Sequence, residues 1–232
     1  MPTRFYLPST GAAAVSPAYD AAWEDTSIAA RLATSTSKIS SASLAVSFSD
    51  AVDTDRDILF RQYVSVAIAA QTIAAQTVKF QIRGAEGNID KNMFSAIGLR
   101  VVSNDGGTVR GTLLAVTRDD LELLVDSFPF DETPAWENRQ FSATTTAVTS
   151  LDNDRIIIEI GTGGDPALDE DHRSGVRIGD ASGTDLPEDN TTTTDNNAWV
   201  EFANVISFEI VTPGALISAA PDIIILDYVV AY

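Results

Sequence analysis

Near the middle of the chain, residues 97–116 read IGLRVVSNDGGTVRGTLLAV, and this segment is the most informative about the fold. Two runs rich in aliphatic residues, 97–102 and 109–116, flank the turn sequence SNDGG at residues 103–107. Asn, Asp and Gly tolerate positive φ, and they are the residues that tight turns between two strands prefer. This stretch therefore predicts a β-hairpin.

Short runs of the same kind recur on both sides of the hairpin and are separated by turn residues. They lie at residues 42–48, 58–68, 77–82, 139–149, 155–160, 174–178, 199–202, 206–211 and 223–230. Within one of them, Ile156, Ile158 and Ile160 alternate with Arg155, Ile157 and Glu159, which predicts an inward and an outward face. About ten strands at this spacing predict an all-β protein, a jelly-roll-like antiparallel β-sandwich.

Two segments depart from the strand pattern. Residues 119–127 read DDLELLVDS, with an acidic N-cap and Leu121, Leu124 and Val125 on one face, which predicts one short helix. Residues 1–41 are rich in Ala, Ser, Thr and Pro and show little periodicity. We therefore expect an extended N-terminal arm over residues 1–41 and a sandwich domain over residues 42–232.

Charge and composition exclude several classes of function. Of the 232 residues, 15 are Lys or Arg and 33 are Asp or Glu, which gives a net charge of −18. Such a chain lacks the clustered cations that nucleic acids and anionic membranes require, so we expect neither as a partner. There is no cysteine, which excludes disulfides and thiolate metal sites. The opening MPTRFYLPSTG lacks an apolar run of signal-peptide length, so we expect synthesis and retention in a cytoplasm.

Catalysis has few candidate residues. The single histidine, His172, lies in LDEDHRSG, where Asp169 or Asp171 could orient it as a general base. The alternative is a solvated histidine in an acidic loop, and no Gly-x-Ser-x-Gly elbow supplies a nucleophile. We therefore expect no catalytic residue and no enzyme activity.

Two kinds of ligand remain possible. Asp165, Asp169 and Asp171 offer the hard oxygen ligands that calcium prefers, although solvated turn residues explain them as well. A structural calcium is the single cofactor considered. The indole of Trp199, with Asp195 and Asn197 before it, is a candidate sugar-binding platform. The alternative is that Trp199 belongs to the core, as tryptophan in a sandwich commonly does.

Six blocks of sequence resemble a family of uncharacterised bacteriophage proteins. They are TRFYLPSTGAAAVSP (3–17), WEDTS (23–27), RDILFRQYVS (56–65), RVVSNDGGTVRGTLLA (100–115), DRIIIEIG (154–161) and DLPEDNTTTTDNNAWVEFAN (185–204). Proteins of this family resemble virion structural components encoded among phage morphogenesis genes. The resemblance implies a structural role in the virion, no enzyme activity, synthesis in the host cytoplasm, and association of the chain with itself, with a trimer as the expected form.

These expectations combine into one leading hypothesis and one alternative. The leading hypothesis is a non-enzymatic phage virion structural protein, a capsid decoration protein that self-assembles and docks on major capsid or tail proteins. The alternative is a tail, neck or fibre component whose β-sandwich binds host carbohydrate. The candidate assembly residues lie at the two ends of the chain: Arg4, Phe5, Tyr6, Leu7, Ile223, Ile225, Tyr228 and Tyr232.

Overall fold

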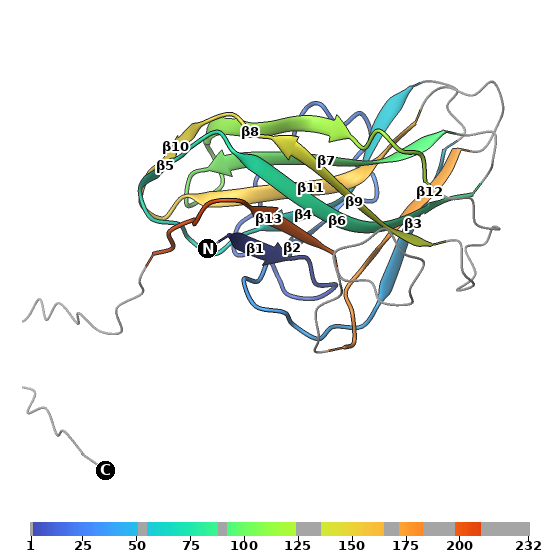
Figure 1. Cartoon of the computed structure of the whole chain (residues 1–232), viewed down its shortest axis with the longest axis horizontal. Coiled ribbons are helices and arrows are strands. Elements are labelled where there is room, and N and C mark those ends of the chain that lie inside the picture. The colour runs from blue at the N-terminus through green and yellow to red at the C-terminus, as the bar shows by residue number, and fades with distance from the viewer. Residues whose placement is uncertain are drawn as a thin grey trace, which may run out of the picture.

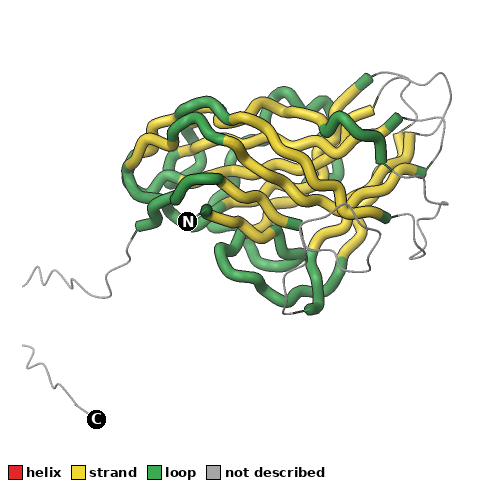
Figure 2. The backbone as a smooth tube through the Cα atoms, in the orientation of Figure 1, coloured by secondary structure: helices red, strands yellow, loops and turns green. Residues whose placement is uncertain are grey.

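The computed structural model describes residues 2–50, 55–87, 92–123, 136–164, 172–182 and 198–209. This part of the chain contains thirteen β-strands and no helix (Figure 1). The strands form two facing sheets and a short ribbon, joined by loops (Figure 2). The predicted all-β sandwich is therefore confirmed. Within the same residues, nothing forms a helix long and apolar enough to cross a membrane.

The first sheet is built around β6 (Thr77–Glu86). On one side of β6 lies β9 (Glu137–Thr144), which pairs with it over eight residues. On the other side, β13 (Trp199–Phe202) and β12 (His172–Ile178) pair with successive halves of β6. Outside these two lie β1 (Thr3–Tyr6), paired with β13, and β3 (Leu44–Asp50), paired with β12. Every pair in this sheet is antiparallel, as expected.

The second sheet has the order β2 (Ala30–Ala33), β4 (Arg56–Val64), β11 (Arg155–Gly164), β7 (Met93–Val102) and β8 (Val109–Arg118). The predicted hairpin is the β7–β8 pair. One pair in this sheet departs from the antiparallel pattern, because β2 runs parallel to β4. The chain makes β3 in the first sheet between these two strands, and so long a connection permits parallel pairing. The ribbon consists of β5 (Gln71–Ile73) and β10 (Val148–Ser150).

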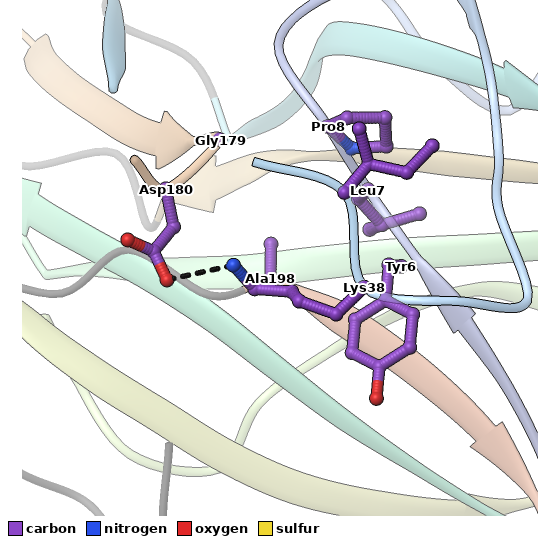
Figure 3. Close-up of a pocket in the computed structure, with 8 residues that line it drawn as sticks. Tyr6, Leu7, Pro8, Lys38, Gly179, Asp180 and Ala198 are labelled. Carbon is purple, nitrogen blue, oxygen red and sulfur yellow. Dashed lines mark hydrogen bonds and ion pairs between the residues drawn. The ribbon is translucent and has the colours of Figure 1, made fainter. Parts of the chain in front are cut away.

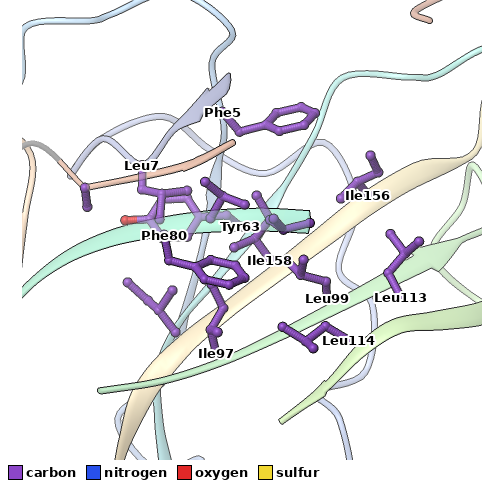
Figure 4. Close-up of a cluster of buried hydrophobic side chains, with 14 of the residues drawn as sticks. Phe5, Leu7, Tyr63, Phe80, Ile97, Leu99, Leu113, Leu114, Ile156 and Ile158 are labelled. Carbon is purple, nitrogen blue, oxygen red and sulfur yellow. The ribbon is translucent and has the colours of Figure 1, made fainter. Parts of the chain in front are cut away.

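The core lies between the inner faces of the two sheets (Figure 4). From the second sheet, Ile156 and Ile158 on β11 meet residues of the first sheet such as Phe80 on β6, as the predicted alternation requires. Ile157 points to the other face of β11, and it too is fully buried. It packs beneath Ala13 and Val15 of the N-terminal arm, residues 1–41. The arm thus covers the outer face of the second sheet as a third layer.

The predicted helix at residues 119–127 is wrong over its described part, because residues 119–123 are not helical. The amide of Asp119 donates to the Ser95 carbonyl at 2.8 Å, and the amide of Leu123 donates to the Met93 carbonyl at 2.8 Å. The chain therefore bends at residues 120–121 and stays beside β7, because its amides bond to β7 carbonyls instead of forming helical bonds. Residues 124–127 lie outside the described part.

The strand predicted at residues 206–211 is also not formed in its described part. Residues 206–209 contain a single bridge, between Phe208 and Ile68. The predicted strand at 223–230 lies outside the described residues, and with it the assembly candidates Ile223, Ile225, Tyr228 and Tyr232.

Candidate functional site

The first assembly candidates form an ordinary strand of the first sheet. The guanidinium of Arg4 lies 4.0 Å from the ring centre of Trp199, and its Nε donates to Glu201 Oε2 at 2.9 Å. Phe5 is fully buried and meets the ring of Phe202 edge to face, at 5.8 Å between centroids. Both side chains are therefore occupied by contacts within the chain.

The next two candidates are held in the same way. The amide of Tyr6 donates to the Ser35 carbonyl at 2.7 Å, and the amide of Leu7 donates to the Ala198 carbonyl at 3.0 Å. The Leu7 side chain is buried in the core. A neighbouring copy could use Phe5 or Leu7 only by exchanging β1, so their role in assembly stays a prediction.

A buried carboxylate fastens the arm to the outer face of the second sheet. Glu159 on β11 has a side chain that is 1% exposed. Its oxygens accept hydrogen bonds from Trp23 Nε1 at 2.9 Å, Gln62 Nε2 at 2.8 Å and Arg100 Nη2 at 2.7 Å. The backbone amide of Asp20 adds another at 3.1 Å. A buried charge is tolerated where it is paired and hydrogen-bonded, and this one meets both conditions.

A second cation extends this network along the arm. The Nε of Arg31 donates to Gln62 Oε1 at 3.0 Å and to the Pro17 carbonyl at 3.1 Å. Its guanidinium lies 4.0 Å from the ring centre of Tyr19. Two parts of the arm, around Pro17 and around Arg31, are therefore tied to each other and to the sheet below.

A third polar contact, between Lys38 and Asp180, holds the end of the arm to the first sheet's loop (Figure 3). The Nζ of Lys38 donates to Asp180 Oδ2 and to the Ser182 carbonyl, each at 2.8 Å. Burial raises the pKa of the Asp180 carboxyl, but hydrogen bonds from Lys38 and Ser182 outweigh it and hold the pKa below its usual value. The hollow beside this pair, which Leu7 and Pro8 also line, has a volume of about 10 Å³, enough for at most one water. This hollow is a small gap between packed side chains and is too small for a ligand.

The structure places the tryptophan of the carbohydrate hypothesis inside the protein. Trp199 on β13 is fully buried, and so is Trp136, the other tryptophan near a loop. An indole with no exposed face cannot stack on a sugar in this fold. The accompanying candidates Asp195 and Asn197 lie outside the described residues.

The metal candidates lie outside the described residues, namely Asp165, Asp169 and Asp171. Among the residues that are described, no three His, Asp or Glu side chains are grouped as a metal site. In the acidic turn at residues 152–154, Asp154 pairs with Arg110 at 3.0 Å and accepts a hydrogen bond from the Leu151 amide at 2.7 Å. The backbone of His172 begins β12 opposite Asp50. Calcium binding stays a prediction.

Among the described residues, one side of the sandwich is open between β8 and β9. These strands are edges of the two sheets, and within the described ranges each pairs with a single strand, β7 or β6. Their ends are bridged: Arg139 Nη2 lies 2.9 Å from Asp119 Oδ2, and the amide of Thr146 donates to the Leu113 carbonyl at 2.7 Å. We call the stretch between these bridges, lined by residues 117–120 and 140–142, the open side.

The open side contains a groove with a volume of about 390 Å³. A second hollow of about 160 Å³ adjoins it and is lined by Lys79 together with residues 140–142. At the centre lies Phe141, which is half-buried against the core and has its ring centroid 5.0 Å from that of Phe80. Phe141 is therefore a partly covered aromatic ring at the floor of this groove.

Neither the buried carboxylate nor the open side is predicted by the sequence patterns above. Glu159 lies between Ile158 and Ile160, in a run that is apolar on both faces except at that position. A charge in such a run requires a buried partner, and this signal could have identified it. For the open side the sequence holds no comparable signal, because a strand at an edge and a strand inside a sheet share the same alternation.

Comparisons with known proteins assign no family. No family model matches the chain, and no curated protein matches it. Among solved structures, a CocE/NonD family hydrolase from Staphylococcus aureus is 8% identical with a TM-score of 0.44, and the match covers 89% of this chain. This chain spans 36% of the length of that hydrolase. The structure of infectious bursal disease virus (Gx strain) is 14% identical with a TM-score of 0.25, over 76% of this chain and 46% of the viral one. Neither similarity is high enough to assign a function.

Proposed function

We propose that the protein is a non-enzymatic structural component of a phage virion, and that it decorates the capsid. In this role it associates with copies of itself and docks on major capsid or tail proteins. It is made in the host cytoplasm and becomes part of the particle there. No cofactor takes part, apart from the structural calcium that the acidic residues 165–171 could hold.

The observation that carries this proposal is the arm packed as a third layer on the sandwich. The contact between Trp23 and Glu159 joins residues 136 positions apart in sequence, and that between Lys38 and Asp180 joins residues 142 apart. Close-packed interiors of this kind resist deformation and transmit strain. A subunit of a capsid shell must resist deformation, and it needs this property more than it needs mobile segments.

Charge supports the same role. The net charge of −18 keeps the chain away from packaged nucleic acid and favours solubility of a particle that displays many copies. The sequence blocks that resemble phage virion proteins contain β4 and parts of β11, β7 and β8, which are neighbouring strands of the second sheet.

The experiment that tests the proposal is immunogold labelling of purified phage particles with an antibody raised against this chain. Gold spread over the heads is the expected result. Gold on the tail or its tip would overturn decoration in favour of the tail, neck or fibre alternative. Absence of gold on intact and on opened particles would overturn the virion role. Antibody pre-absorbed with the purified chain is the control for specificity.

A further inference from the structure

The first sheet ends at β3, and this edge is exposed to solvent (Figure 1). The register between β3 and β12 covers all seven residues of β3 without a shift, and β12 is the single described strand that pairs with it. Ala45 and Ser47, which lie on the outer face of the sheet, are both exposed. The strand is therefore straight, regular and accessible along its outer side.

This edge lacks the features that normally prevent a strand from pairing with another chain. Such features are charged side chains, proline, bulges and short length. Residues 39–49 read ISSASLAVSFS and contain no charge, no proline and no glycine. The other described edges are protected: β1 and β2 have four residues each, β8 shows register shifts against β7, and β9 begins with three buried residues, 137–139. We conclude that β3 is the edge most open to pairing.

The inner face of β3 also leaves apolar surface uncovered. Leu44, Val46 and Phe48 alternate with the exposed small residues, and Val46 belongs to the buried core. Phe48 packs against that core but is only half-buried, and Leu44 is 40% exposed. One more strand beside β3 would remove this apolar surface from water, which is favourable.

The strand is complementary to itself in an antiparallel register centred on Val46, which then faces Val46 of the second copy. On the inner face, Leu44 of each copy lies opposite Phe48 of the other. On the outer face, Ala45 lies opposite Ser47. Residues that face each other thus share a face of the sheet, as strand pairing requires, and the pair of an aliphatic and an aromatic residue adds favourable energy.

Charge favours a second copy as the occupant of this edge. In a chain of net charge −18, most surfaces of two copies repel each other. Along residues 39–49 no charges can face each other, so two acidic copies can approach there. A basic protein would find no acidic side chain on this stretch, and a nucleic acid would find no cation.

We propose that two copies of this chain pair through β3 in a two-fold dimer, which joins their first sheets into one continuous sheet. The inference rests on the proposed function and names the surface through which the chain associates with itself. The pairing is isologous, because the same residues contribute from both copies. It differs from the three-fold association that the family resemblance implies, so the two are separable by mass.

The first test uses the absence of cysteine from the chain. In a mixture of full-length Ala45→Cys and Ser47→Cys, left to exchange subunits, the two thiols face each other within reach of a disulfide. In either variant alone the thiols lie diagonally, about 7–8 Å apart, which is too far. We expect oxidation with copper phenanthroline to give a covalent dimer on a non-reducing gel from the mixture and little from either variant alone.

Thr72→Cys, at an exposed position on β5, is the control for random collision and is expected to stay monomeric on the same gel. Cross-linking in the mixture no higher than in the separate variants would overturn the pairing through β3.

The second test measures mass in solution by light scattering over a dilution series. The unmodified chain is expected at twice 24.7 kDa. Ala45→Asp/Ser47→Asp places carboxylates opposite each other in both outer pairs and is expected at 24.7 kDa. An equimolar mixture with Ala45→Lys/Ser47→Lys, which makes the same pairs opposite in charge, is expected to restore the dimer. Thr72→Asp/Thr112→Asp adds the same charge at exposed positions elsewhere and is expected to stay dimeric.

A monomeric wild-type chain, or a mass of three times 24.7 kDa, would overturn the β3 dimer. If the aspartate variant fails to fold, the cross-linking result decides. These outcomes are independent of where gold labels the particle.

A different occupant of the same edge would be the apolar run at residues 223–230 of a neighbouring copy. Ile225→Asp in the full-length chain separates the two, because it places a charge in that run and leaves β3 unchanged. We expect Ile225→Asp to remain dimeric. A monomeric Ile225→Asp beside a dimeric wild type would assign the edge to the C-terminal run and overturn the pairing of β3 with itself.

Discussion

Glu159 accepts hydrogen bonds from Trp23, Gln62 and Arg100 at a place that water hardly reaches. Its value to the fold depends on this complete set of partners, because each of them comes from a different segment. Removing one charge of a buried pair leaves the other uncompensated, which costs more than the pair itself contributes.

We expect Glu159→Gln to lower the free energy of unfolding by about 3 kcal/mol or more, because it strips Arg100 of its buried counter-charge. The matched control is Glu201→Gln, which breaks the more exposed pair with Arg4 and is expected to cost less than about 1 kcal/mol. Urea denaturation of both variants measures the difference. Similar losses at the two positions would contradict the role given to Glu159.

A second buried carboxyl gives the protein a pH dependence. Burial raises the pKa of Glu86 to about 8, the neighbouring Glu122 contributes to the rise, and a hydrogen bond from the Met93 amide opposes it. The ordinary value is 4.5, so Glu86 stays protonated in the folded chain at pH values where the unfolded chain has released the proton. Its contribution to stability is therefore complete below pH 4.5 and is lost as the pH rises to about 8.

Glu86→Gln should remove this pH dependence, because the amide keeps an acceptor for Met93 and does not ionise. We expect the free energy of unfolding of the variant, relative to that of wild type, to be about 1–3 kcal/mol higher at pH 8 than at pH 5. Chemical denaturation at the two pH values, with wild type measured in parallel, gives the difference. If the stabilities of wild type and variant changed with pH in the same way, Glu86 would not be the source of the pH dependence.

At the scale of elements, β11 depends on a glycine at the point where it bends. The register between β11 and β4 shifts between Ile160 and Gly161. A Cβ atom on Gly161 would overlap the carbonyl oxygen of Ile58 and lie 2.8 Å from the ring of Trp23. The absence of a side chain therefore lets β4 approach from one side and the arm from another.

We expect Gly161→Ala to destabilise the fold by about 3 kcal/mol or more, since backbone atoms must move to admit the methyl group. Gly107→Ala is the control: its nearest neighbour would be Asp105 Oδ1 at 3.4 Å, an ordinary contact. Thermal melting followed by circular dichroism compares the two variants. If both melt at the wild-type temperature, the close approach at Gly161 is not structurally important.

At the scale of the whole molecule, the arm and the sandwich share their buried surface. The arm supplies β1 to the first sheet and β2 to the second, and between these strands it covers Leu59, Val64 and Ile157. The arm of residues 1–41 and the sandwich of residues 42–232 thus differ in sequence pattern, but their side chains pack against each other in a shared buried surface.

We expect residues 42–232 expressed alone to lose cooperative unfolding, because removal of the arm exposes an apolar sheet face and leaves Glu159 without its partner Trp23. The full chain is the reference, and restoration by an added peptide of residues 1–41 is the control for specificity. Circular dichroism and limited proteolysis follow the outcome. A truncated chain that unfolds cooperatively at the full-length temperature would instead establish the sandwich as an independent domain.

The hairpin at residues 97–116 and the inward face of β11 were predicted, because strand alternation and turn chemistry are local properties. The helix at residues 119–127 was not formed in its described part, because Asp119 and Leu123 bond to β7, a partner that local propensity does not contain. Of the candidate ligand residues, Trp199 was placed on a strand correctly, but its burial depends on strands far away in sequence.

An acidic, cysteine-free, all-β protein, with its hairpin and the alternation of its strands, follows from the order of amino acids alone. The tertiary structure alone decided what lies over each face: the arm over Ile157 and Glu159, the neighbouring strands over Trp199, and no described strand over the outer edge of β3. The physical reason is that alternation specifies the side of a sheet to which a residue points. What covers that side is fixed by contacts such as that between Trp23 and Glu159, which are distant in sequence and meet only when the chain folds.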